Sequence, residues 1–355
     1  EKDYSYFKNS FFKLFLVFWL LFNLSTIFSD AILYSLKYSL SYLRFGIFVL
    51  AINYLIDKNN KFIQHFYYFL FGTIIFILLD SYFQFLFSYN ILGFERPTNY
   101  IVSGFFNDEE ILGTYLMRLS PLLISLYFFL SDEQRLKFNS YLIYIAIIFP
   151  MIFLSGQRTP FFLSTIFLVS SLILLNIDKK KILSLIFSLT IIFTNIFIDK
   201  KVYDGIGTGY KNRMITDIIY NQKLISAEQK KEIEKYKYIQ FIFLSPGHNS
   251  LWLTAIELFK KKKIFGHGPN TFRKKCSILS EKPQFSCSTH PHNYLFQIFS
   301  EMGFISGLIY LLVYFYIILF VLKYYFNFKK TGEIKNFYIV KIFLLSSILV
   351  NFAPL

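Results

Sequence analysis

Long apolar runs separated by short charged breaks are the feature that most constrains how this chain folds. Nine runs of at least 17 residues cover residues 11–28, 31–56, 62–87, 111–130, 138–154, 160–177, 182–198, 293–322 and 337–355. Because a helix rises about 1.5 Å per residue, about 20 apolar residues cross a hydrocarbon core about 30 Å thick. The sequence therefore predicts an all-α polytopic membrane protein with about nine or more transmembrane helices.

The composition supports this class and excludes others. Hydrophobic residues make up 55% of the 355 positions and charged residues only 17%, which is too little charge for a soluble globular chain of this length. The alternating strands of about ten residues that build an outer-membrane barrel are absent. The first run also lacks the small-residue cleavage site of a signal peptide. Because the sequence begins at Glu1 and stops inside an apolar run at Leu355, we expect a fragment.

The surplus of positive charge predicts the orientation of the helices. The chain has 37 Lys and Arg against 22 Asp and Glu, a net charge of +15. In a soluble protein this surplus would favour nucleic acid, but membrane proteins concentrate Lys and Arg in short cytoplasmic loops. With the N-terminus inside, the short breaks at 58–61, 135–137, 179–181 and 323–335 all fall in the cytoplasm. We therefore expect a lipid bilayer as partner and no nucleic acid.

The opposite membrane face then receives the breaks at 89–110 and 155–160 and the long stretch 199–291, whose lysines are exempt because the charge rule applies to short loops. This predicts seven transmembrane helices in residues 1–198, an extracytoplasmic, partly helical loop over 199–291 and further transmembrane helices in 292–355. Within the loop we predict an interfacial amphipathic helix, Leu251–Phe259, with Trp252, Ile256 and Phe259 on one face.

The only two cysteines, Cys276 and Cys287, both lie in this loop. An oxidising compartment would permit a disulfide that braces the segment before His290, and two free thiols are the alternative. No Cys or His spacing resembles a zinc module, so we predict no metal site and no cofactor.

Three ionisable residues fall inside predicted spans at a similar depth below the outer end of their helix: Lys37, Asp80 and Arg118. Such residues are costly in lipid and usually pair or line a wet cavity. We expect Asp80 to pair with Lys37 or Arg118. The alternative is a cationic cavity that opens outward and binds an anionic ligand, which makes Arg118 a candidate binding residue.

Two outward segments carry candidate functional side chains. Arg158 lies in the turn 155–160, where its planar guanidinium suits phosphate oxygens, although a helix-end anchor at the headgroups is the alternative. His292 precedes an apolar run and can take a proton from an attacking hydroxyl near neutral pH. His290 and Asn293 beside it favour a functional role over a structural one. Glycines 266 and 268 can shape a backbone nest for anions.

Taken in order, these motifs resemble the O-antigen ligase and polymerase superfamily. The most specific part is His292-Asn293 followed by Glu301-Met302-Gly303. The remaining matches are Arg96 with Ser103-Gly104 and Leu112-Gly113, Gly156-Gln157-Arg158, Gly247 to Trp252, and Gly266-His267-Gly268-Pro269.

The resemblance implies a metal-independent glycosyltransferase of the bacterial inner membrane whose active site is on the periplasmic side, so that 199–291 is a periplasmic loop. Ligases move a glycan from undecaprenyl pyrophosphate to lipid A core in lipopolysaccharide biosynthesis, whereas polymerases move it to another lipid-linked glycan. The family histidine at the place of His292 activates the acceptor hydroxyl, and the arginine at the place of Arg158 holds the pyrophosphate. We expect Arg96, Arg118, His248, His290 and Asn293 to bind substrate.

One departure from the family concerns a second arginine. Relatives commonly have Gly-Arg four residues before the loop tryptophan, and this chain has Gly247-His248. A protonated His248 can serve there, or Arg213 or Arg273 can substitute. The sequence does not separate ligase from polymerase, and a lipid-linked glycan transporter and a noncatalytic scaffold are the competing classes. The polar residues gather on one membrane face and no internal repeat is visible, which disfavours a transporter.

Overall fold

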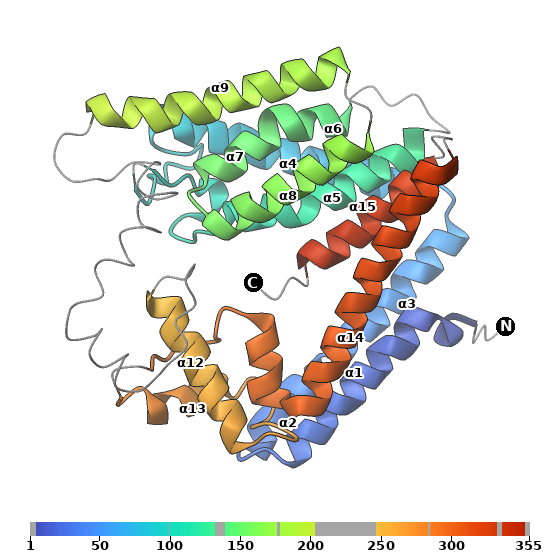
Figure 1. Ribbon diagram of the computed structural model, residues 1–355, viewed down its shortest axis with the longest axis vertical. Coiled ribbons are helices and arrows are strands. Elements are labelled where there is room, and N and C mark those ends of the chain that lie inside the picture. The colour runs from blue at the N-terminus through green and yellow to red at the C-terminus, as the bar shows by residue number, and fades with distance from the viewer. Residues whose placement is uncertain are drawn as a thin grey trace. The chain divides into compact units, whose positions relative to one another are not determined.

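The computed structural model describes residues 5–98, 100–131, 139–175, 178–202, 246–282, 285–331 and 336–351. In these ranges the regular elements are helices, together with two isolated bridges, Tyr89 to Glu95 and Thr98 to Ile101 (Figure 1). The predicted all-α class is therefore confirmed. Most of the predicted loop, including Arg213, lies outside the described residues, and so does the break at 135–137.

The helices divide between two compact units, which we describe separately. The first contains η1 (Ser5–Lys8), α1 (Ser10–Ile27), α2 (Ile32–Ser41), α3 (Leu43–Lys58), α12 (Pro246–Lys261), α13 (Phe272–Leu279) and α14 (Tyr294–Thr331) up to residue 316. The second contains α4 (Phe62–Phe87), η2 (Gly104–Phe106), α5 (Leu112–Ser131), α6 (Ser140–Ile143), η3 (Tyr144–Ile148), α7 (Phe149–Leu154), α8 (Arg158–Leu174), α9 (Lys179–Val202), the rest of α14 and α15 (Asn336–Asn351).

Each predicted apolar run is largely helical. Among the described residues, five helical stretches are long and apolar enough to cross a membrane: Ser10–Ile27, Ile32–Lys58, Phe62–Phe87, Leu112–Leu130 and Tyr294–Asn327. Three shorter apolar helices, Ser140–Leu154, Arg158–Leu174 and Tyr338–Asn351, and the helix α9 coincide with the other runs. The chain is thus a multi-pass membrane protein, and the larger number of nine spans stays a prediction.

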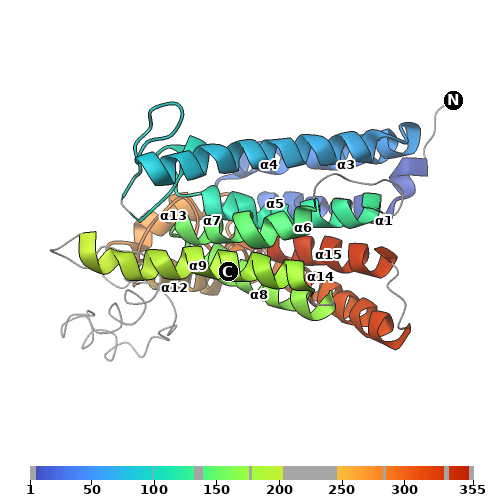
Figure 2. The same cartoon turned by 90° about the horizontal axis from the view of Figure 1, so that it is seen from above.

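The second unit is a bundle of roughly aligned helices around α5, η3 and α7 (Figure 2). Every residue of α7 is buried. Tyrosine hydroxyls bond across the bundle: Tyr67 with Ser140 at 2.8 Å, and Tyr144 to the carbonyl of Ser164 at 3.0 Å. Apolar side chains such as those of Phe162 and Leu183 are exposed on its outer helices. Polar groups satisfied inside and apolar groups outside are what a lipid environment requires.

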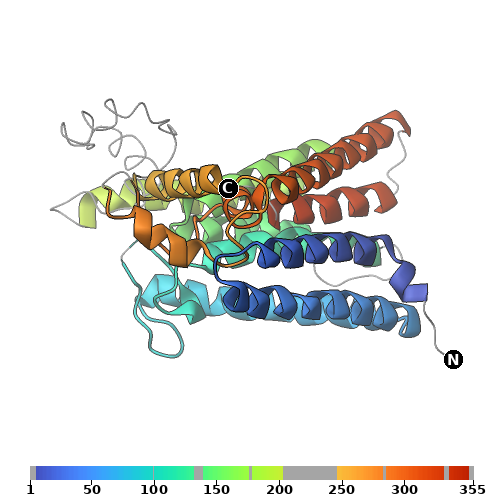
Figure 3. The same ribbon diagram turned by 90° about the horizontal axis from the view of Figure 1, so that it is seen from below.

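In the first unit α1 packs beside α2 and α3 (Figure 3). The indole of Trp19 donates a hydrogen bond to the carbonyl of Ser39 at 2.9 Å. The predicted helix 251–259 is confirmed as part of α12, and its position at the membrane interface stays a prediction. Its buried side chains form a small core with α13 and the segment after it, made of Leu251, Trp252, Leu253, Ala255, Leu258, Phe272, Cys276, Leu279 and Phe285.

Asp80 corrects the predicted pairing of charges. Its side chain is fully buried in α4 and accepts hydrogen bonds from the backbone N–H of Ile91 at 2.9 Å and from the side-chain amide of Asn90 at 3.4 Å. The loop after α4 therefore occupies this carboxyl with hydrogen bonds, and the predicted ion pair with Arg118, in the same unit, is wrong, whereas the pair with Lys37 stays a prediction. Lys37 is exposed on α2 in the other unit.

Candidate functional site

Two loops of the second unit are joined by backbone contacts at one end of the bundle. The side-chain oxygen of Gln84, near the end of α4, accepts hydrogen bonds from the N–H groups of Ser103 and Gly104 at 2.9 and 2.8 Å. The N–H of Val102 donates to the carbonyl of Leu154, the last residue of α7, at 3.1 Å. The segment 101–104 is thereby fixed against the turn that leads to Arg158.

Arg158 is the first residue of α8, and two glycines make its position possible. Gly156 has φ +69°, and a Cβ there would lie 2.8 Å from the carbonyl oxygen of Tyr100. The side-chain oxygen of Gln157 accepts a hydrogen bond from the N–H of Thr114 at 2.7 Å, and a Cβ on Gly113 would meet this oxygen at 2.7 Å. Three segments that are distant in the sequence, at 100–101, 113–114 and 156–157, therefore meet at the N-terminus of α8, which is the positive end of the helix.

Arg96 and Arg118 belong to the same loops and helix end. The Nε of Arg96 faces the carbonyl oxygen of Ile101 at 3.5 Å, and its guanidinium carbon lies 5.6 Å from the centre of the Phe85 ring. Arg118 follows Thr114 by one turn of α5 and is half-buried. The structure thus brings the three predicted arginines to one end of the second unit.

Three histidines gather in the first unit. His248 lies in the first turn of α12, while His290 and His292 precede α14. The ring centroid of His292 is 4.2 Å from that of His290 and 5.4 Å from that of His248. His292 is exposed and has φ +54°, a strained value for a residue with a side chain.

His290 is the half-buried member of this group. Its Nδ1 lies 2.9 Å from the hydroxyl of Thr289. Burial, with smaller contributions from the charges of His292 and Arg273, lowers the pKa of His290 below its ordinary value. The neutral imidazole is therefore favoured near neutral pH. The exposed Arg273, in the first turn of α13, is close enough to act on this ring.

Covalent and capping bonds hold the histidine segment. Cys276 and Cys287 form a disulfide with their Cα atoms 4.9 Å apart, so the predicted brace before His290 is confirmed. The side chain of Asn293 is buried, and its oxygen accepts a hydrogen bond from the N–H of Phe296 at 3.0 Å. This oxygen caps the N-terminus of α14.

The glycines at 266 and 268 do not form the predicted anion nest. The N–H of Gly266 donates to the carbonyl of Lys262 at 3.2 Å, and that of Gly268 donates to the carbonyl of Glu301 at 2.7 Å. These donors are already used within the fold, so the prediction of an anion site there is wrong. Positive φ values of +69° and +102° instead let the loop pass close to the backbone of Glu301 in α14 at Gly266 and close to the side chain of Ser29 at Gly268.

Glu301 ties the same loop to α14. The carboxylate is buried and accepts hydrogen bonds from the N–H groups of Asn270 and Phe272, both at 2.9 Å, and from the amide of Gln297 at 3.2 Å. At Gly303 the helix is broken, with φ +78° and ψ −173°. The sequence singled out Glu301 and Gly303 only as part of a family motif. In the structure they have a structural role, because they join α14 to this loop.

Asp30 was not predicted as a site residue. It forms ion pairs with Lys262 and, at 2.9 Å, with Lys275, and it lies 3.3 Å from Nδ1 of His267. These partners hold the pKa of Asp30 well below its usual range, with Lys262 the largest contributor. Nε2 of His267 is 3.0 Å from the carbonyl oxygen of Leu258. The turn between α1 and α2 is thereby locked to the loop after α12.

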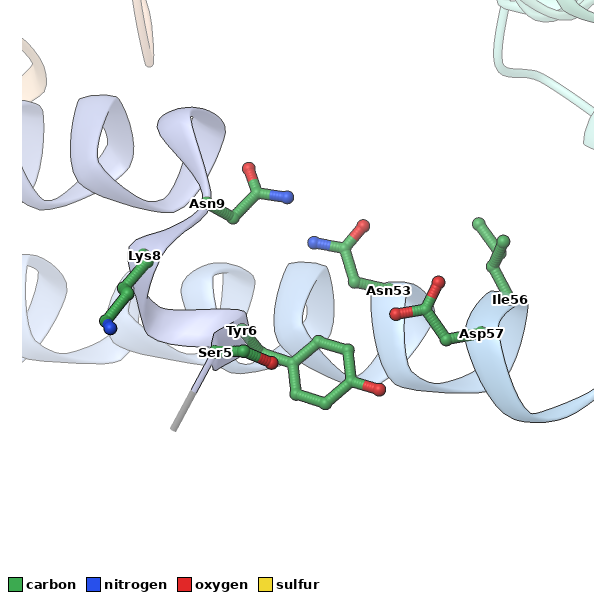
Figure 4. A pocket seen from close by; sticks show the side chains of 7 residues that line it. All are labelled: Ser5, Tyr6, Lys8, Asn9, Asn53, Ile56 and Asp57. Carbon is green, nitrogen blue, oxygen red and sulfur yellow. The ribbon is translucent and has the colours of Figure 1, made fainter. Parts of the chain in front are cut away.

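A separate pocket of about 350 Å³ lies near the start of α1 (Figure 4). Its lining residues are Ser5, Tyr6, Lys8, Asn9, Asn53, Ile56 and Asp57. The 18 residues of α1, about 27 Å of helix, separate these residues from Asp30. The lining of this pocket contains none of the predicted site residues. In the part of the chain that the structure describes, no group of three or more His, Cys, Asp or Glu is arranged to hold a metal ion.

The fold and these residues define a multi-pass helical membrane protein with an arginine-rich end in one unit and a histidine cluster in the other. Residues 143–311 match the family described as O-antigen ligase, a little under half of the chain. This stretch, which includes Arg158, His248, His290 and His292, matches the O-antigen ligase family, and this match supports the resemblance seen in the motifs. No curated protein and no solved structure matches the chain.

Proposed function

We propose that the chain is an O-antigen ligase-like glycosyltransferase of the bacterial inner membrane. It moves a glycan from undecaprenyl pyrophosphate to a hydroxyl of lipid A core, or of a similar acceptor, at the periplasmic face. The observation that carries the proposal is the exposed ring of His292 beside two further histidines inside the matched region. The family match supports a ligase or polymerase type of reaction.

In this reaction the acceptor oxygen bonds to the anomeric carbon while the bond from that carbon to the pyrophosphate oxygen breaks. The acceptor hydroxyl must lose a proton and the departing pyrophosphate must be stabilised. We assign the proton to His292, whose exposed ring is accessible to a hydroxyl. The neutral His290 beside it, 4.2 Å away, leaves His292 without a fixed positive neighbour on that side.

The arginines are assigned to the pyrophosphate. Arg158 combines a bidentate guanidinium with the positive end of α8, which is a favourable place for phosphate oxygens. Arg96 and Arg118 at the same end of the second unit add positive charge. Fixed cations take the part that a divalent metal plays in other transferases, so we propose a metal-independent reaction with no cofactor.

The missing loop arginine has two remaining candidates among the described residues. His248 lies 5.4 Å from His292, and Arg273 acts on His290 through its charge. Because a guanidinium is permanently charged, we assign the second cation to Arg273 and acceptor binding to His248. Asn293 is assigned to positioning through its cap on α14.

The test is the surface-glycan profile of cells that carry His292→Ala or Arg158→Ala at matched protein level, with lipid-linked intermediates extracted in parallel. We expect long glycan to vanish from lipid A core and polymer to accumulate on undecaprenyl pyrophosphate. Single repeat units on the core would identify a polymerase instead. His65→Gln, an exposed histidine in α4, is the matched control and should leave the profile unchanged. An unchanged profile in both test variants would contradict the proposal.

A further inference from the structure

A basic segment follows α12 and is attached to the turn between α1 and α2 of the same unit. This turn, 28–31, joins two helices that are long enough to cross a membrane, so it lies at a bilayer surface. The ring of Phe265 stacks on that of Phe28 with centroids 4.0 Å apart. The hydroxyl of Ser29 donates to the carbonyl of His267 at 2.7 Å. The segment 262–267 is therefore held at the same membrane surface as the turn.

The lysines at the end of α12, in the segment 262–267 and in α13 fall into two groups. One group forms ion pairs within the fold, and the other stays exposed at the surface. Lys262 and Lys275 are partly buried and form ion pairs with Asp30. Lys260 lies 3.5 Å from Glu257. Lys261 and Lys263 are exposed, and within the described residues neither has an acidic partner. Two cations at the membrane surface therefore remain for a ligand outside the protein.

Apolar side chains are exposed beside these two lysines. Ile264 follows Lys263 directly and is 60% exposed. Ile27, Phe28, Ile32 and Leu33 around the attached turn are exposed as well. Exposed apolar groups next to lysines are typical of segments that lie in the headgroup region, because the apolar groups reach the acyl chains while the ammonium groups stay at the phosphates.

We propose that Lys261 and Lys263 bind the phosphate groups of anionic phospholipids in the adjoining leaflet, with Ile264 inserted among the upper acyl carbons. Charge complementarity selects an anionic headgroup over a zwitterionic one, by about fivefold for each lysine near the surface. This contact anchors the end of α12, and with it the loop that Glu301 ties to α14, at a defined depth. The inference does not depend on glycosyl transfer.

The test compares phospholipids that stay bound to the full-length protein. The protein is reconstituted into nanodiscs of mixed phosphatidylglycerol and phosphatidylcholine and extracted into detergent, and the retained lipids are quantified by mass spectrometry. We expect the wild type to retain phosphatidylglycerol in preference to phosphatidylcholine. In Lys261→Gln/Lys263→Gln the ratio of retained phosphatidylglycerol to phosphatidylcholine should be at least tenfold smaller. The control is Lys261→Arg/Lys263→Arg, which keeps both positive charges at the same two positions and should behave as wild type.

Folding of the double variant is checked by its melting temperature in phosphatidylcholine alone, where it should match wild type. Three results would overturn the proposal: equal retention by wild type and the Lys261/Lys263 variant, an equal loss in the control, or no preference for phosphatidylglycerol in the wild type. A loss that appears only together with a lower melting temperature in phosphatidylcholine would also count against it. None of these results bears on the glycan profile.

Discussion

At the residue scale, the most constrained position is Gly303. Its φ of +78° breaks α14, and a Cβ there would run into the carbonyl group of Ile264. The N–H of Phe304 donates to the carbonyl of Lys263 at 2.7 Å, so the break gives the loop after α12 a backbone partner. A glycine is required here for its positive φ and for the close approach of another backbone.

Gly303→Ala should therefore destabilise the protein by about 2–4 kcal/mol, since the strained backbone and the clash with backbone atoms add up. Gly72→Ala is the matched control, because Gly72 lies inside α4 with nothing within 4 Å of an added Cβ. That substitution should be neutral or slightly stabilising, as alanine is the better helix former. Thermal unfolding in detergent measures both. Equal melting temperatures for the two variants would contradict the close contact at Gly303.

His267 gives stability a pH dependence. Burial lowers the pKa of His267, although the nearby Asp30 carboxylate and the carbonyl of Leu258 oppose the shift. Below the ordinary pKa of about 6.5 the unfolded chain takes up a proton that the folded chain takes up only at lower pH. Folding stability is therefore present at higher pH and is lost as pH falls, by at most about 1.4 kcal/mol per pH unit for one proton.

His267→Gln should remove this part of the dependence. Melting temperatures of wild type and variant measured from about pH 7.5 to about pH 5 should fall more steeply with acid in the wild type. His290→Gln serves as the comparison, because the pKa of His290 is also lowered by burial but its ring is outside the Asp30 cluster. Parallel curves for wild type and His267→Gln would show that this ring does not remain neutral in the fold.

At the scale of elements, the disulfide joins α13 to the segment that carries His290 and His292. Cys276 belongs to the small core of α12 and α13, while Cys287 is exposed on the chain that leads to α14. The bond closes a loop with a sequence separation of 11 residues. Such a short loop fixes where the histidines lie relative to Trp252 and Phe296, whose rings pack at 4.8 Å.

Cys276→Ser/Cys287→Ser should cost about 2–3 kcal/mol of stability, the size expected for closing a loop of this order. The double substitution should also reduce glycan transfer by more than its loss of stability explains, because His290 and His292 are then no longer held by the disulfide. The measurement is the glycan profile at matched protein level together with the melting temperature. A normal profile alongside a lowered melting temperature would limit the disulfide to a structural role.

At the scale of the whole molecule, the apolar runs predicted the helices well. Each run has to satisfy its own backbone hydrogen bonds in lipid, so its length and hydropathy alone determine that it is helical. The turn predicted over 155–160 is present but shorter, at 155–157, because α8 begins at Arg158. The start of α14 at the His292 motif was also predicted, because helix-starting residues and apolar runs are local signals.

Contacts between distant segments were beyond prediction. The ion pairs of Asp30 join residues more than 230 positions apart, and the three histidines meet only after α12 and the segment before α14 pack together. Asp80 was assigned an ionic partner because its depth was counted along a helix, while the loop that bonds it folds back over that helix. Side-chain partners depend on chain reversals that periodicity does not encode.

The most direct test of the central claim is transfer by the purified protein. Wild type, His292→Ala, Arg158→Ala and the control His65→Gln are each incubated in lipid with an undecaprenyl-pyrophosphate glycan and lipid A core, and the glycosylated product is measured over time. We predict product from wild type and His65→Gln without added metal and in the presence of a chelator. The rate should fall by at least about 100-fold in His292→Ala, as expected for loss of a general base. Transfer at the wild-type rate by His292→Ala and Arg158→Ala would contradict the account.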